Sequence, residues 1–86
     1  MKNMLKNASA LADKMRNMAD QGPLPSNVSE MLEEAADKLE EKDKDLSVRI
    51  NTAGSLLDQI SNDPNIKQHT RTEIWNLASQ VENLND

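Results

Sequence analysis

The sequence predicts one all-α domain, a four-helix bundle whose consecutive helices run antiparallel. Three observations support this prediction: the 86-residue length suits one domain, apolar residues recur every three or four positions, and three polar breaks separate four stretches of helical length. The breaks are short, which favours antiparallel neighbours. The predicted helices span approximately residues 2–20, 26–41, 46–62 and 67–84.

The first two predicted helices are amphipathic and carry opposite net charge. One face of the first helix is apolar and includes Leu11 and Met15, and the second helix repeats this pattern. Residues 1–21 carry four basic and two acidic side chains, whereas residues 25–45 carry three basic and eight acidic ones. This contrast favours packing of the two helices against each other. The carboxylates predicted to face solvent on the second helix are Glu30, Glu33, Glu34, Asp37, Glu40 and Glu41.

The third and fourth predicted helices have the same apolar period. Their apolar positions are Leu46, Ile50, Ala53, Leu57 and Ile60, and then Ile74, Leu77, Ala78 and Val81. Asn27, followed by Glu30, is typical of a capping box at the start of the second helix. Asp45 is a candidate N-cap of the third, and the fourth begins near Lys67. Gly54 costs the third helix about 1 kcal/mol relative to alanine, so we expect a neighbouring helix, or alternatively a ligand or partner backbone, to approach closely there.

Composition and charge exclude several classes of site and partner. The chain has no cysteine, which excludes disulfides, thiolate metal sites and a cysteine nucleophile, and favours the cytoplasm. No apolar run at the N-terminus is long enough for a signal peptide or a membrane span, so we expect no membrane association. A formal net charge of −5 disfavours broad binding of nucleic acid. With 36% hydrophobic residues the core is thin, and we expect self-association as a homodimer.

The sequence lacks the side-chain combinations that catalytic and metal sites require. The carboxylates of the second helix have spacings of three and four residues, but they lie opposite the apolar stripe and no Glu-x-x-His pair accompanies them. His69 is the only histidine, and we expect it at the surface or at a helix end. We therefore expect no enzyme, no metal site and no cofactor.

A group of polar and aromatic residues in the second half of the chain is the candidate interaction surface. Trp75 is the only aromatic residue and follows Arg71 by one helical turn, so the guanidinium can stack on the indole. The indole either closes an edge of the core or anchors a partner, since Trp and Arg are enriched at binding hot spots. The arginines early in the third and fourth helices do not amount to an internal repeat. The candidate surface comprises Arg49, Asn62, Asp63, Asn65, Arg71 and Trp75.

Three runs in the C-terminal half resemble a known family. They are DLSVR at 45–49, ISNDPNI at 60–66 and HTRTEIW at 69–75. Over residues 25–84 the chain resembles uncharacterised protein family 0147, a family of small archaeal proteins, and over the first helix only length and helical pattern agree. The resemblance implies an archaeal cytoplasmic protein with a compact helical bundle, and it carries no activity, cofactor or catalytic residue. Lys67 stands where the family often has proline at the start of its last helix.

We therefore expect a non-catalytic module that binds another protein or a second copy of itself. One alternative is an RNA- or ribosome-associated accessory protein whose first helix contacts phosphates. The basic side chains of that helix are Lys2, Lys6, Lys14 and Arg16. A second alternative is a metal-binding protein or enzyme that uses the carboxylates of the second helix.

Overall fold

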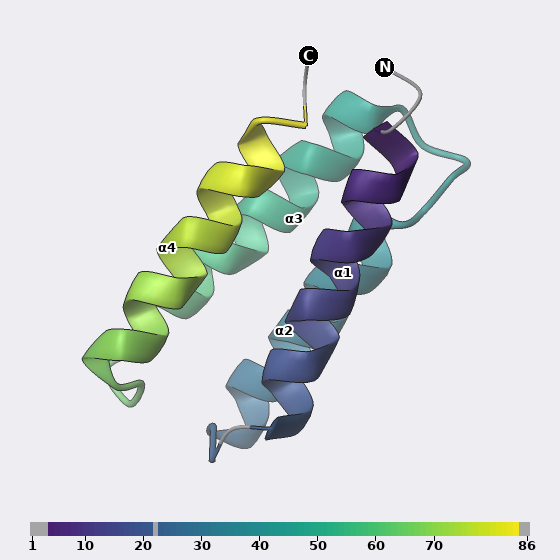
Figure 1. The fold of residues 1–86 in the computed structure, drawn as a ribbon. Helices are drawn as coiled ribbons and strands as arrows, with labels where there is room; N and C mark the ends of the chain where they lie inside the picture. Colours follow the sequence, from purple (N-terminus) through teal and green to yellow (C-terminus); the bar gives the residue numbers. More distant parts are fainter. Residues whose placement is uncertain (1–3, 22, 85–86) are drawn as a thin grey trace.

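Four antiparallel helices make up the computed structural model, which describes residues 4–21 and 23–84. Each connection reverses the chain direction, so the helices alternate up and down along the long axis (Figure 1). The predicted four-helix bundle is confirmed, and each predicted boundary lies within two residues of the observed one, apart from the start at residue 2, which lies outside the described residues. The helices are α1 (Met4–Gln21), α2 (Ser26–Leu39), α3 (Leu46–Ser61) and α4 (Gln68–Glu82).

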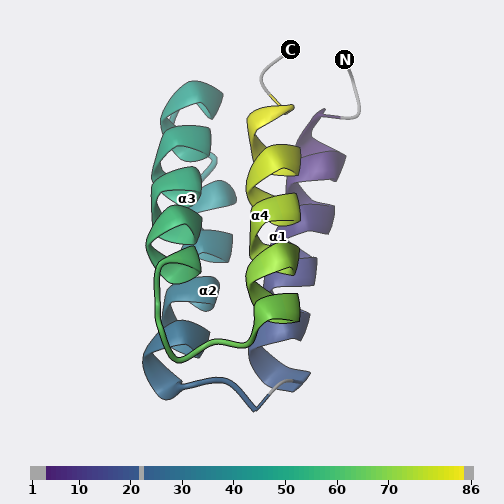
Figure 2. The ribbon, with the colours of Figure 1, turned by 90° about the vertical axis from the view of Figure 1, so that its left-hand side faces the viewer.

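Consecutive helices pack closely, whereas the first and last helices meet only loosely. α1 packs on α2, α2 on α3 and α3 on α4, and α1 approaches α4 at few positions. In the view of Figure 2, α4 stands in front of α1, and the start of α1 and the end of α4 lie at the same end of the bundle. The four helices therefore form a ring that is incompletely closed between α1 and α4.

The core consists of the apolar stripes that the sequence predicts. Met15, Leu32 and Leu57 come from three different helices and have no exposed surface. Burying one such side chain contributes about 1.5–3 kcal/mol relative to leaving it in water. Most of the large apolar side chains that the structure describes point inward in this way, apart from Val48 and Trp75. The largest fully buried side chains are Met15, Leu32, Leu39, Leu57, Ile60, Ile74, Val28 and Val81.

The start of α2 differs from the predicted capping box. Its N-cap is Pro25, whose carbonyl accepts the amide of Val28 at 3.0 Å, and no side chain caps the helix. Asn27 lies inside the first turn and donates from Nδ2 to Oδ2 of Asp63 at 3.1 Å. The predicted cap is wrong because α2 begins before Asn27, at Ser26, so Asn27 lies inside the helix and its side-chain amide donates instead to the α3–α4 connection.

Asp45 occupies the N-cap position of α3, as predicted, and Lys67, near which the fourth helix was predicted to begin, occupies the N-cap position of α4. Both have extended backbone, and neither makes a side-chain hydrogen bond to the helix. Their backbone carbonyls accept the amides of Arg49 and Arg71 at 3.1 and 3.0 Å. Each helix thus begins within one residue of the predicted start, and only backbone hydrogen bonds cap its first turn.

Gly54 lies in the middle of α3 with no neighbouring helix close to it. A Cβ atom added at this residue meets no neighbouring atom within 4 Å. The expectation that a helix of the same chain approaches closely here is therefore wrong. The half-buried position leaves room for a side chain.

Replacing Gly54 with alanine is expected to stabilise the fold by about 1 kcal/mol, because alanine favours helix and restricts the unfolded chain. For a domain of this size the melting temperature, measured by circular dichroism, should rise by about 4–8 °C. A lower melting temperature would contradict the open surroundings of Gly54 and restore the expectation of a close neighbour.

Candidate functional site

Two residues of the candidate surface, Arg49 and Arg71, hold the ends of the helices that precede them. Arg49 is 5% exposed, and its Nε donates to the carbonyl oxygen of Leu39, the last residue of α2, at 3.0 Å. Arg71 is half-buried, and its Nε donates to the carbonyl oxygen of Ser61, the last residue of α3, at 2.8 Å. Carbonyls in the last turn of a helix lack helical partners and carry partial negative charge. Each guanidinium therefore satisfies and neutralises a helix end.

The two arginines belong to a structural unit that occurs twice. In each copy a helix ends, a six-residue connection follows (40–45 or 62–67), and arginine is the fourth residue of the next helix. In both copies the donor lies ten residues after its acceptor. The sequence does not reveal this repeat because EEKDKD and NDPNIK have no identical residue at equivalent positions. The repeat is one of backbone shape and of the arginine that stabilises it.

Asp63 holds the α3–α4 connection together. Its Oδ1 accepts the backbone amide of Asn65 at 2.7 Å, and its Oδ2 accepts the side-chain amide of Asn27. Its backbone carbonyl accepts Nη2 of Arg71 at 2.8 Å. The side chains of Asn62 and Asn65 are exposed. This part of the candidate surface is thus a hydrogen-bonded turn that joins the start of α2 to α4 and presents two amides to solvent.

Trp75 lies outside the core. It is 52% exposed and does not belong to the cluster of buried apolar residues. It lies one turn beyond Arg71 on α4, while the Arg71 guanidinium donates to the backbone carbonyls of Ser61 and Asp63. Val48 on α3, at 47%, is the other large exposed apolar side chain among the described residues. The structure therefore brings Arg71 and the turn together at the start of α4, places Trp75 one turn further along, at the middle of the helix, and gives Arg49 a separate place at the opposite end of the bundle.

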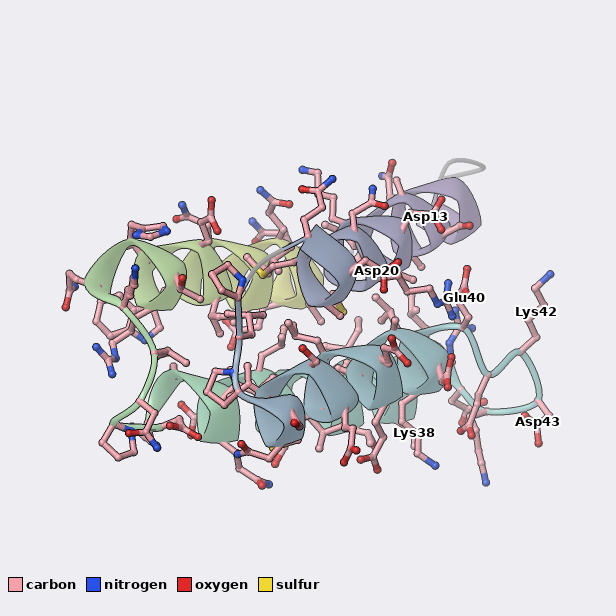
Figure 3. The ribbon with its side chains drawn as sticks, turned by 90° about the horizontal axis from the view of Figure 1, so that it is seen from below. Asp13, Asp20, Lys38, Glu40, Lys42 and Asp43 are labelled. Atoms are coloured by element: carbon pink, nitrogen blue, oxygen red, sulfur yellow. The ribbon has the colours of Figure 1, made fainter. Side chains whose placement is uncertain are left out.

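A charged network joins α1 to α2, as their opposite net charges predict. Nη2 of Arg16 lies 2.9 Å from Asp37 and 2.8 Å from Glu40, and Nη1 lies 3.7 Å from Asp13. Figure 3 shows Asp13 and Glu40 along this edge of the bundle. The hydrogen bonds to Asp37 and Glu40 raise the pKa of Arg16 above its ordinary value. Because these side chains remain partly or largely exposed to solvent, each ion pair contributes only modestly to stability.

The basic side chains on which the RNA-binding alternative depends have different surroundings. Arg16 is paired with Asp37 and Glu40, and Lys14 lines a hollow that also contains Glu73. The side chains of Lys2 and Lys6 lie outside the described residues. No contact in the described part of the chain favours this alternative.

The seam between α1 and α4 is the feature that sequence reasoning missed. Three adjoining hollows of about 290, 430 and 320 Å³ follow it from the connections at one end of the bundle towards the other. The sequence carried one signal, because Asn76, Gln80 and Asn83 are spaced four and three residues apart. The exposed amide side chains that line the three hollows are Asn7, Asn17, Gln21, Asn65, Asn76, Gln80 and Asn83.

The remaining polar side chains offer little chemistry. His69 is exposed, as predicted, and so are Glu30, Glu33 and Glu34 on the outer face of α2. Within residues 4–21 and 23–84, no three histidine, cysteine or acidic side chains come together as metal ligands would. None of the described helices is long and apolar enough to cross a membrane.

Comparison with known proteins identifies the family. The model of the Uncharacterised protein family (UPF0147) matches residues 1–84, which includes the first helix, where the resemblance from sequence alone was loose. A UPF0147 protein of Methanothermobacter thermautotrophicus is 38% identical over 72 residues, which cover 84% of this chain and 71% of the relative. One of Methanosarcina mazei is 37% identical over 70 residues, or 81% of this chain and 75% of the relative.

A third relative, from Methanocaldococcus jannaschii, is 35% identical over 81 residues, which cover 94% of this chain and 84% of the relative. No solved structure matches the chain. All three relatives are archaeal and bear the name of the same family. The chain belongs to the archaeal Uncharacterised protein family UPF0147.

Proposed function

We propose that the protein is a non-catalytic interaction module of the cytoplasm that binds another protein through the part of α4 around Trp75. The observation that carries this proposal is the exposure of that residue: the only aromatic side chain of a chain with a thin core is 52% exposed. An indole offers a large apolar surface and one hydrogen-bond donor, which makes it a strong anchor once a partner covers it.

Of the other candidate residues, some would contact the partner and the rest would hold those contact residues in position. Asn62 and Asn65 are exposed and offer amide donors and acceptors near the start of α4. Arg71 and Asp63 are tied to backbone groups of the same turn, so they would fix the position of the contact residues. Arg49 would act at a distance, by holding α3 against the end of α2.

Truncating Trp75 is expected to weaken partner binding strongly without unfolding the protein. Tagged wild-type protein and the variants Trp75→Ala and Val48→Ala would be used to capture partners from a lysate of the source organism, followed by mass spectrometry and binding assays with the purified partner. Val48→Ala is a matched control, because it removes a comparably exposed apolar side chain from a different helix. We expect Trp75→Ala to weaken binding at least tenfold, as is typical of a hot spot, and Val48→Ala to leave it unchanged.

Circular dichroism separates a binding defect from a folding defect. Because Trp75 lies outside the core, its truncation should leave the helical signal and the cooperative melt intact. If Trp75→Ala instead unfolds the chain, the residue is structural. If both variants bind the purified partner like the wild type, the proposed surface is wrong.

A further inference from the structure

We infer that the hollow between the α1–α2 and α3–α4 connections binds a small apolar molecule that carries a carboxylate. We call this hollow, the smallest of the three along the seam, the end hollow. Both connections lie at the same end of the bundle (Figure 2) and line it together with the last turns of α1 and the first turns of α4. Its volume of about 290 Å³ is near the lower limit for ligand pockets and therefore suits a small ligand. Trp75 does not line it, so the inference does not rest on the proposed function.

The start of α4 gives the end hollow a positive wall. The first amides of a helix lack helical partners and carry partial positive charge. In α4 no side chain caps these amides, and the first turn contains no acidic residue. Lys67, the N-cap residue, lines the end hollow and forms no ion pair with another described residue. A carboxylate bound at this wall would interact favourably with the ammonium group and with the helix end.

A buried hydroxyl group opens into the same hollow. Thr70, in the first turn of α4, is 6% exposed, and its hydroxyl has no hydrogen-bond partner among the described residues, whereas the exposed Thr72 donates to the carbonyl oxygen of Gln68 at 3.2 Å. No fully enclosed side-chain nitrogen or oxygen in the described ranges lacks a partner. The hydroxyl of Thr70 must therefore reach the end hollow, which its residue lines. It is a donor positioned for a ligand oxygen beside Lys67.

The other side of the end hollow is apolar. Met18 on α1 and Leu24 in the α1–α2 connection pack against the core, but both are only half-buried. Both line the end hollow, and so do Pro23 and Pro25. A hydrocarbon group placed there would cover apolar surface that the fold leaves in water, which favours binding. The ligand that fits both walls is therefore an apolar chain ending in a carboxylate.

Glu73 determines which end of the end hollow receives the carboxylate. It is the one acidic residue among those that line the hollow, and it comes six residues after Lys67. Six residues of α-helix correspond to about 9 Å along the axis. A ligand carboxylate would therefore lie at the start of α4, with Lys67 and Thr70, and the repulsion from Glu73 would oppose the reverse orientation.

An NMR titration with isocaproate, a branched apolar carboxylate, tests for this site. Amide resonances of residues that line the end hollow should shift on addition of the acid, with a dissociation constant on the order of 1 mM. Isocaproamide has the same apolar chain without the negative charge and should bind at least about fivefold more weakly. An acetylated tripeptide ending in leucine presents the same groups at a peptide C-terminus. If it binds more tightly than isocaproate, the natural ligand is the C-terminus of a chain, and otherwise it is a free acid.

Variants assign the binding to the two proposed walls. Thr70→Val removes only the hydroxyl and should weaken isocaproate binding about tenfold, because a hydrogen bond to a charged acceptor is lost. Lys67→Gln should weaken binding about threefold, whereas Glu73→Gln should strengthen it about twofold, because these variants remove an attractive and a repulsive charge. The amide spectrum of each variant reports whether the fold is retained.

Matched controls carry the same substitutions away from the end hollow. Thr72→Val on α4 and Lys42→Gln on the α2–α3 connection (Figure 3) change exposed residues that do not line it, and neither should alter the affinity. Trp75→Ala should also bind isocaproate like the wild type. Equal shifts with the acid and its amide, no shifts at all, equal effects of the two threonine variants, or weaker binding by Glu73→Gln would each overturn the inference.

Discussion

Replacing Leu57 with alanine is expected to lower the free energy of unfolding by about 3 kcal/mol, within the range of about 2–5 kcal/mol for such truncations. Leu57 is fully buried on α3, which packs against both α2 and α4, so its truncation would leave a cavity in the core. A domain of this size has a total stability of roughly 5 kcal/mol. Urea denaturation followed by circular dichroism should therefore show a midpoint less than half that of the wild type.

Leu56 provides the control for this prediction. It has the same side chain, lies next to Leu57 in the chain and is only half-buried at the edge of the core. Leu56→Ala should therefore lower stability by about 1 kcal/mol, since less apolar surface is lost and water can fill the space. Equal losses for the two variants would show that α3 is rotated relative to the structure described.

Replacing Arg49 with methionine is expected to lower the free energy of unfolding by about 2 kcal/mol. Methionine keeps most of the apolar stem, but it removes a charge-assisted hydrogen bond to the last residue of α2, and such bonds are worth about 1.5–3 kcal/mol. The carbonyl of Leu39 loses the partner that now satisfies it. Thermal denaturation should show a melting temperature about 10 °C lower.

Two further variants separate this bond from a general loss of positive charge. Lys38→Met removes a cation from the same end of α2, where Lys38 pairs with Glu41 at 3.4 Å on the surface, and should change stability by less than about 1 kcal/mol. Arg71→Met should be as damaging as Arg49→Met, because Arg71 donates to two carbonyls. The two arginines serve opposite ends of the bundle, so their effects should add in the double variant. If Arg49→Met lowers the stability no more than Lys38→Met does, the role assigned to Arg49 is wrong.

The helices and the core could be predicted from the sequence because both depend on a local period. In α3 the alternation of Leu46, Ile50, Ala53 and Leu57 by four, three and four residues can place these side chains on one face only of a helix. The same stripe then faces the neighbouring helices in the structure. The helix boundaries could also be predicted from local sequence, because proline and short polar runs interrupt the apolar pattern.

The hydrogen bonds and the seam could not be predicted, because they depend on which helices meet and how closely. Asn27 and Asp63 are 36 residues apart, so no local pattern in the sequence shows that the side-chain amide of Asn27 donates to the carboxylate of Asp63. Arg49 and Arg71 looked like surface residues because arginine usually is one, whereas both reach back to a preceding helix. The seam follows from the loose approach of α1 to α4. The apolar stripes predict which face of each helix is buried, but they do not predict how closely two helices approach each other.

Site-specific crosslinking in cells tests most directly whether the surface around Trp75 binds another protein. A photoreactive amino acid would replace Trp75, or Val48 as the equally exposed control, and adducts would be identified by mass spectrometry after irradiation of the living organism. The account predicts that one polypeptide other than the chain itself is captured repeatedly at position 75 and is absent at position 48. Identical adducts at both positions, or none at position 75, would contradict it.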